Sequence, residues 1–188
     1  MKRFVRTIAS AAVAMFVAVG VAPAQDIQVQ MLTNRAGGYQ IGVPADWAVA
    51  SPEGLDYVFV APDHETFCMV MSGAFEPVAT MSESELRAGL SQNLGPEIWD
   101  SLFFSDVPGR QYITTSAIAD YPSGWPVQFA AVNGNPVMDG KPTATTFAGI
   151  FTFKKGSIFM VMCAAPKGSF NNAKPGISVV LATLNVTK

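Results

Sequence analysis

The sequence of 188 residues contains a single histidine, His64, so any Ser-His-Asp or Cys-His mechanism would have to use it. His64 lies between Asp63 and Glu65, in a polar segment that separates two apolar runs. Consecutive side chains in a turn diverge and are normally solvated, so we expect this triplet to form an exposed turn and not a metal site. A metal-binding protein or hydrolase centred on His64 is the alternative function.

The two cysteines, Cys68 and Cys163, both lie in apolar segments with strand character. Two cysteines in an exported chain favour a disulfide, which requires their Cα atoms to lie within about 7 Å of each other. The alternative is a pair of buried free thiols that pack as small apolar side chains. His64 and Lys167 lie beyond the ends of these segments, so neither is placed to activate a catalytic cysteine.

Other motifs of enzyme chemistry are missing from the sequence, and we expect no cofactor. It contains no G-x-S-x-G, no H-E-x-x-H and no glycine-rich phosphate loop after a strand. Methionine pairs spaced two residues apart point to one face of a strand, where core filling is a better explanation than copper binding. These methionines are Met69, Met71, Met160 and Met162.

Polar and aromatic residues in the second half of the chain suggest a binding surface. Tyr121 and Trp125 belong to the turn-like sequence YPSGWP, and residues 133–142 have the composition of an exposed loop. Such loops often carry binding function, although packing within a hairpin is the alternative explanation for the two aromatics. The proposed binding residues are Tyr121, Trp125, Asn133, Asn135 and Asp139.

Composition limits the classes of partner. Charged residues make up 14% of the chain and the formal net charge is -2, which argues against nucleic-acid binding. Apolar residues make up 49%, enough to bury a hydrophobic core.

The first 24 residues resemble a bacterial secretory signal. Lys2, Arg3 and Arg6 precede an uncharged run over residues 8–21, and Ala22-Pro23-Ala24 supplies small residues at a cleavage site. The run is shorter than the roughly 20 residues that a membrane-spanning helix needs. We therefore expect cleavage before Gln25, a single domain over residues 25–188 with no membrane span, and a periplasmic or secreted location.

Hydrophobic periodicity predicts two groups of strands, each followed by a helix. Ser82 and Glu85 form a capping box at the start of the first helix, which we expect to run to Leu94, before Gly95-Pro96 and a helical turn to Trp99. Pro175 is tolerated only in a first turn, so the last helix is expected over residues 174–184. The expected strands cover residues 39–43, 47–49, 57–61, 67–71, 111–119, 127–132, 143–153 and 158–163.

This order predicts an α+β fold with an antiparallel sheet sandwiched by helices. The segments 39–43 and 47–49 are expected to pair around a tight turn. Trp47 is expected to anchor this pair against a helix in the core.

Several segments resemble the PsbP/Mog-type superfamily, including its bacterial DcrB-like exported members. Residues 39–47 (YQIGVPADW) are similar to its opening Y-x-I-x-V-P-x-x-W pattern, and residues 59–63 to the following strand and turn. A Ser-Glu-rich helix, a hydrophobic hairpin and a helix that ends at Leu184-Asn185-Val186 follow in the same order.

The resemblance implies an α/β/α sandwich and an accessory or binding role without a shared catalytic motif, so no functional residue is transferred. We therefore expect a non-enzymatic exported protein of the cell envelope that binds an envelope protein or a small ligand through its surface loops.

Overall fold

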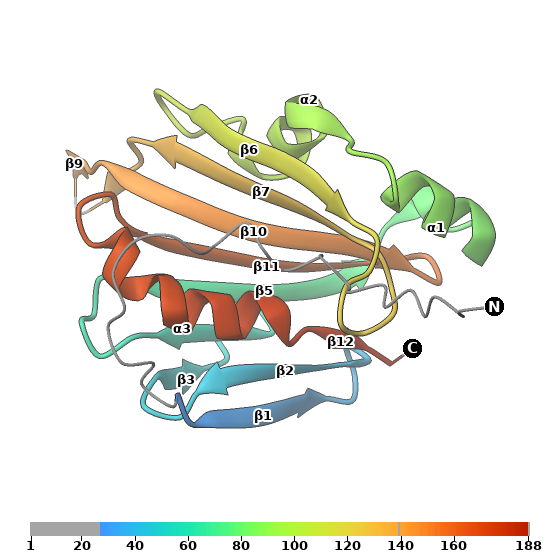
Figure 1. Ribbon diagram of the computed structural model, residues 1–188, viewed down its shortest axis with the longest axis horizontal. Coiled ribbons are helices and arrows are strands. Elements are labelled where there is room, and N and C mark those ends of the chain that lie inside the picture. Colours follow the sequence, from blue (N-terminus) through green and yellow to red (C-terminus); the bar gives the residue numbers. More distant parts are fainter. Residues whose placement is uncertain (1–26, 139, 188) are drawn as a thin grey trace, which may run out of the picture.

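A seven-stranded antiparallel sheet forms the centre of the computed structural model, which describes residues 27–138 and 140–187 (Figure 1). Its strands, in spatial order, are β3 (Ala48–Ala50), β4 (Tyr57–Val60), β5 (Phe67–Ala74), β11 (Ser157–Pro166), β10 (Thr145–Lys154), β7 (Val127–Gly134) and β6 (Gln111–Ile118). The six ladders that join them are all antiparallel.

A second antiparallel sheet contains three strands, β1 (Val29–Asn34), β2 (Tyr39–Pro44) and β12 (Asn185–Val186). The expected pairing of residues 39–43 with 47–49 is therefore wrong, because β2 and β3 belong to different sheets. The Trp47 N–H donates to the Pro44 carbonyl at 3.0 Å, and this turn carries the chain from one sheet to the other. β1 was not predicted, although Val29 and Met31 alternate with Gln30 as in a strand; both of these apolar side chains are exposed.

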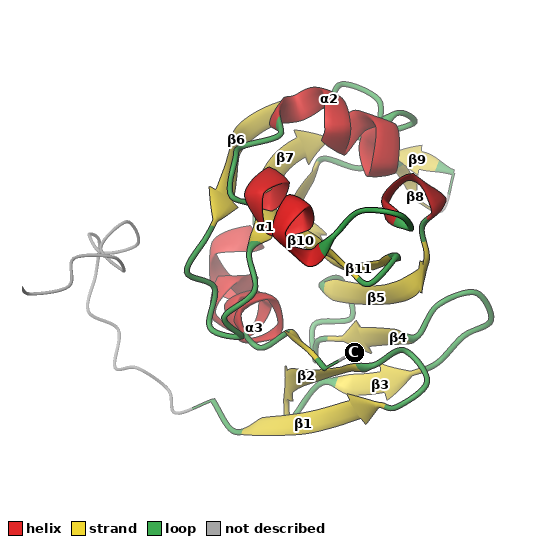
Figure 2. Cartoon of the chain, turned by 90° about the vertical axis from the view of Figure 1, so that its right-hand side faces the viewer, coloured by secondary structure: helices red, strands yellow, loops and turns green. Residues whose placement is uncertain are grey.

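Helices cover both faces of the large sheet (Figure 2). On one face lie α1 (Glu83–Leu90), α2 (Gly95–Trp99) and the wider π-helical turn η2 (Asp100–Phe104), after the short 3-10 turn η1 (Glu76–Val78). On the other face lie α3 (Phe170–Ala182) and the small sheet. The predicted α+β sandwich with an antiparallel sheet is confirmed.

Side chains of the central strand β11 alternate between the two hydrophobic cores. Phe159, Val161 and Cys163 pack toward α3 and the small sheet, whereas Met160 and Met162 pack toward α1 and α2. Period-two alternation with both faces buried is the pattern of an interior strand covered on both sides. The two methionines of β11 therefore fill the second core, as predicted.

Helix α1 begins at the predicted capping box but ends at Leu90, four residues before the expected Leu94. The side chain of Gln128, fully buried in β7, explains this early end. Its Nε2 donates to the carbonyls of Leu90 and Gln92 at 2.7 and 2.8 Å, and its Oε1 accepts from the Leu94 N–H at 3.1 Å. In a longer helix the Leu94 N–H would donate to the Leu90 carbonyl, so Gln128 replaces that bond with two of its own.

Helix α3 begins at Phe170, so Pro175 lies inside it and not in its first turn as expected. The missing N–H of Pro175 leaves the Asn171 carbonyl without its helical donor, and both residues are exposed, so water can replace that bond. The next residue, Gly176, lies against the indole of Trp47, where an added Cβ would be 2.6 Å from the ring. Trp47 is 8% exposed, which confirms its expected place in the core against a helix.

Candidate functional site

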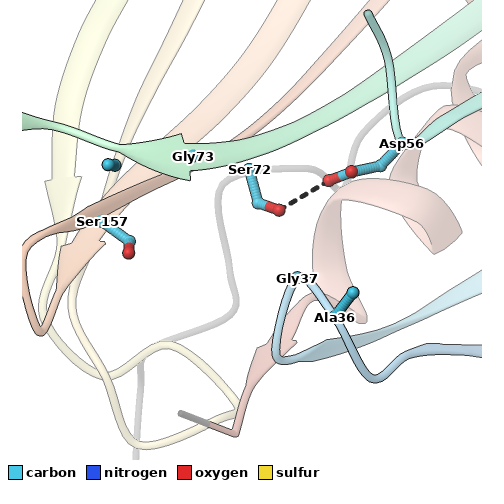
Figure 3. Close-up of a pocket in the computed structure, with 7 residues that line it drawn as sticks. Ala36, Gly37, Asp56, Ser72, Gly73 and Ser157 are labelled. Atoms are coloured by element: carbon cyan, nitrogen blue, oxygen red, sulfur yellow. Dashed lines mark hydrogen bonds between the residues drawn. The ribbon is translucent and has the colours of Figure 1, made fainter. Parts of the chain in front are cut away.

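A pocket of about 320 Å³ opens between the β1–β2 turn and the neighbouring ends of β5 and β11 (Figure 3). Its volume lies at the lower end of the range of roughly 300–1,000 Å³ that is typical of ligand pockets. Four segments that are well separated in sequence form the pocket. The lining residues are Ala36, Gly37, Asp56, Ser72, Gly73, Ala74 and Ser157.

Asp56 supplies the carboxylate of this pocket from the position before β4. Its Oδ2 accepts two hydrogen bonds, from the Ser72 hydroxyl at 2.7 Å and from the Tyr39 hydroxyl at 3.2 Å. Among the described residues, no donor reaches Oδ1. The carboxylate is thus held in place through one oxygen while the other is available to accept a hydrogen bond.

Tyr39 links the pocket to the core. Its ring is buried and packs edge-on against Tyr57 and Phe159. Burial raises the pKa of the Tyr39 phenol above its ordinary value, and the neighbouring Asp56 carboxylate raises it further. The hydroxyl therefore keeps its proton at neutral pH and remains a donor to Asp56.

The β1–β2 turn closes over Ser72 because residue 37 is glycine. A Cβ at Gly37 would lie 2.7 Å from Ser72 Oγ and 2.8 Å from Tyr39 Cε1. The Gly37 N–H donates to Asn34 Oδ1 at 2.7 Å, which fixes the turn, and Asn34 Nδ2 lies 3.4 Å from the Tyr39 hydroxyl. The wall of the pocket opposite β5 is therefore part of one hydrogen-bonded unit with Asp56.

Within the described part of the chain, the edge of β5 has no neighbouring strand where it borders the pocket. β4 pairs with β5 only as far as Tyr57 opposite Val70, whereas β11 pairs with β5 up to Ala74. The Val70 carbonyl accepts from Asp56 N on the β4 side, and the Phe75 N–H donates to Gly156 on the β11 side. Because backbone groups alternate sides along an antiparallel strand, those of Ser72 and Ala74 point away from β11, past the end of β4.

Chemically, this arrangement suits binding. It offers a carboxylate oxygen, hydroxyl groups, and backbone donors and acceptors for which the described residues provide no strand neighbour. In Ser-His-Asp hydrolases the serine is activated by an imidazole. Here the only histidine, His64, lies in the β4–β5 turn, at the opposite end of that hairpin from Asp56 and Ser72.

Comparison with known proteins places the architecture. No protein-family model and no curated protein sequence matches the chain. Among the solved structures that match is the PsbP protein CyanoP of Synechocystis sp. PCC 6803, with 12% identity, coverage of 89% of this chain and 98% of that chain, and a TM-score of 0.54. LpqN of Mycobacterium tuberculosis has 15% identity, coverage of 87% of this chain and 93% of that chain, and a TM-score of 0.52. The Saccharomyces cerevisiae Ran-binding protein Mog1p has 10% identity, coverage of 86% of this chain and 97% of that chain, and a TM-score of 0.52.

The chain has the PsbP/Mog-type fold. The resemblance drawn from residues 39–47 is thereby confirmed at the level of the fold, while membership of the DcrB-like group stays a prediction. Among the residues that the structure describes, no helix has both the length and the apolar content to cross a membrane.

Within this PsbP/Mog-type fold, His64 is exposed and has a φ of 57°, a turn conformation. Partial burial opposes ionisation of Asp63, but hydrogen bonds from Thr66 and from the Glu65 N–H outweigh it and lower the pKa of this carboxyl. Its oxygens therefore organise the turn. Across residues 27–138 and 140–187, no cluster of three metal-ligating side chains is found.

Cys68 and Cys163 form a disulfide, the first of the two alternatives left open by the sequence. They are direct partners in the β5–β11 ladder, with Cα atoms 3.9 Å apart, and both are fully buried.

Tyr121 lies in the core of the PsbP/Mog-type fold, so the expectation that it lies at the surface is wrong. The residue is 4% exposed, and its hydroxyl donates to the Leu181 carbonyl and accepts from the Leu184 N–H. These two bonds satisfy backbone groups where α3 ends, a structural task that the turn-like sequence around Tyr121 did not indicate.

Trp125 is also buried, at 3% exposed, and the surface expectation for it is corrected in the same way. Its Nε1 donates to the Phe153 carbonyl at 2.9 Å. The Arg87 guanidinium and the Lys154 ammonium lie 4.1 and 5.0 Å from its ring centre, which suits cation–π attraction. Both aromatics thus pack within the fold, which was the alternative explanation for them.

The predicted loop over residues 133–142 is shorter than expected. β7 extends through Asn133 to Gly134, and Asn133 Oδ1 accepts from the Thr146 hydroxyl of β10 at 2.8 Å. Asn135 is exposed, and its N–H donates to the Pro108 carbonyl. The rest contains two short paired strands, β8 (Val137–Met138) and β9 (Lys141–Pro142), while Asp139 lies outside the described residues.

Asp56 and Ser72 were missed by the sequence analysis. A hairpin of the strands expected over residues 57–61 and 67–71 would place its two open ends side by side, so that a polar residue just before the first strand and another just after the second would lie at one end of the sheet. That signal was present in the sequence. The closure by Gly37 was not, because it depends on how the second sheet packs against the first.

Proposed function

We propose that this chain is an exported, non-enzymatic binding protein of the cell envelope and that it binds its partner at the Asp56 pocket. One observation carries the proposal: Ser72 and Tyr39 hold Asp56 Oδ2, and no described donor occupies Oδ1. A carboxylate oriented in this way, beside unpaired strand backbone, is prepared to accept a hydrogen-bonding group from a partner.

The compartment is supported by two independent features. The first 24 residues have the pattern of a secretory signal, and Cys68 and Cys163 are joined by a disulfide, which persists in oxidising compartments. The structural neighbour LpqN is described as involved in cell envelope biogenesis, which agrees with this location.

Binding without turnover is supported by the fold. The neighbour Mog1p is a Ran-binding protein, so one protein with this architecture acts by contact with another protein. Exposed Asn135 and the exposed strands β8 and β9 lie at the far end of the sheet from the pocket and are a further contact surface in this proposal.

Site-specific photo-cross-linking in the intact cell envelope tests the proposal. Gly73 is exposed, lines the pocket and has nothing within 4 Å of its Cβ position, so it is a suitable position at which to introduce p-benzoyl-phenylalanine. Gly168 is equally open, lies beyond the opposite end of β11 and is the matched control. We expect a discrete adduct from position 73 that is absent from position 168 and weakened by Asp56→Asn.

Equal labelling from both positions would contradict the proposal. Turnover of ester or peptide substrates that His64→Ala abolishes would contradict it too, in favour of the hydrolase alternative.

A further inference from the structure

We infer that the pocket takes an extended peptide segment, which adds to the open edge of β5 and places a lysine or arginine side chain on Asp56. This inference rests on the proposed function and names the class of partner for the same site. Strand addition of this kind draws its affinity from backbone hydrogen bonds and its specificity from pockets for alternate side chains.

The backbone of β5 can supply the hydrogen bonds that strand addition needs. Between Ser72 and Ala74 the strand keeps β11 on one side and has lost β4 on the other. Unpaired strand edges pair readily with another extended chain unless something covers them. Here the edge is bordered by a pocket, so it is accessible over a short length only, which suits a short extended segment.

Asp56 can supply the preference for a basic side chain. Among the described residues it is the only charged one that lines the pocket, and no cation pairs with it. A lysine ammonium or an arginine guanidinium could donate a charge-assisted hydrogen bond to Asp56 Oδ1. A partner placed along β5 would bring alternate side chains to the face that Asp56 occupies.

Neighbouring charges limit how basic the partner can be. Arg35 precedes Ala36 in the β1–β2 turn, and Lys155 lies in the turn that leads to Ser157. These two cations disfavour a continuous basic run. The geometry therefore favours one basic residue flanked by neutral or acidic ones.

Selection from a randomised hexapeptide display library tests the inference with the mature chain, residues 25–188. We expect the enriched peptides to carry one lysine or arginine within a strand-forming sequence. The best peptide, labelled with fluorescein, should bind the wild-type chain in an anisotropy titration. Replacement of its basic residue by norleucine should weaken binding about tenfold, the scale of one charge-assisted hydrogen bond.

Three protein variants separate the contribution of the Asp56 carboxylate from that of the β5 edge. Asp56→Asn should weaken the basic peptide about tenfold and leave the norleucine peptide nearly unchanged, whereas Asp106→Asn, at an exposed carboxylate remote from the pocket, should change neither. Ala74→Pro removes an N–H that points away from β11, so the sheet should stay folded while both peptides lose affinity. Thermal melts confirm that each variant is folded.

The inference is overturned if the selected peptides show no excess of basic residues, or if folded Ala74→Pro binds them as the wild type does. Cross-linking from position 73 is independent of these peptides. A specific adduct there with no basic-peptide binding would therefore reject the peptide class and leave the proposed binding function standing.

Discussion

Cys163 lies directly opposite Cys68 in the ladder between β5 and β11, and the bond between their sulfur atoms joins residues 95 apart in sequence. β11 is the strand that connects β5 with β10, so the disulfide fixes the first half of the large sheet to the second at its centre. Both sulfurs are inaccessible to solvent in the folded protein.

Replacement of both cysteines by alanine should lower the free energy of unfolding by about 2–5 kcal/mol, because the unfolded chain regains the entropy that the closed loop removes. Urea unfolding of the oxidised wild type and the double variant measures this difference. The intact protein, denatured without reductant, should take up no alkylating agent; modification of two thiols would show that the bond is absent.

Gly176→Ala should destabilise the protein by about 1–3 kcal/mol even though alanine favours helices over glycine. The added Cβ would lie 2.6 Å from Cζ2 of the Trp47 ring, which is buried and cannot move aside freely. Gly89→Ala in α1 is the matched control, since nothing lies within 4 Å of its Cβ position. That variant should be neutral or more stable by up to about 1 kcal/mol, and equal effects at both positions would refute the packing argument.

Trp47→Ala should lower the free energy of unfolding by about 3–5 kcal/mol, the usual effect of removing a large buried aromatic side chain. The indole fills the space between the β2–β3 connection and α3. Thermal melts of the variant and the wild type measure this loss of stability. A negligible change in melting temperature would place Trp47 at the surface.

Tyr121→Phe should cost about 1–3 kcal/mol near neutral pH, because it leaves the buried Leu184 N–H without its acceptor. Burial raises the pKa of the Tyr121 phenol, and the Leu184 hydrogen bond opposes this only in part. The unfolded phenol ionises near pH 10, so the stability that it contributes is complete below about pH 10 and is lost as the pH rises toward the higher folded-state pKa.

The wild type should therefore lose stability more steeply than Tyr121→Phe between about pH 9 and about pH 11. Some slope should remain in the variant, because the pKa values of Tyr39 and Tyr112 are raised as well, in both cases by burial first. Urea unfolding midpoints of the wild type and of Tyr121→Phe, measured across this pH range, compare the two slopes. Equal slopes would exclude a raised Tyr121 pKa.

N-terminal sequencing of the protein exported by its own cell should begin at Gln25, as the small residues of Ala22-Pro23-Ala24 predict. Recovery of Met1 in a membrane fraction would contradict cleavage.

Local patterns predicted most of the elements because each rests on neighbouring residues. The capping box at Ser82 and the alternation in β11 are examples, and both appear as expected. What escaped prediction depends on tertiary partners. Gln128 ends α1 from a strand that lies 38 residues beyond Leu90, and the two residues of β12 form a strand only because β2 is beside them.

The candidate site was predicted less well for the same reason. Tyr121 and Trp125 belong to a turn-like sequence, and the partners that bury them, α3 and β10, come later in the chain. The Asp56 pocket needs the β1–β2 turn to approach β5, and that approach depends on how the second sheet packs against the first.

The position of β11 between β5 and β10 also constrains how the protein folds. Strands β3, β4 and β5 share no ladder with β10, β7 and β6, so the two groups become one sheet only when residues 157–166 arrive. Until then the inner edges of β5 and β10 stay unpaired, which exposes the newly made chain to aggregation and to chaperone capture. Contacts so distant in sequence slow folding, so the assembly of this sheet is governed by its fourth strand in space, which is synthesised after the other six.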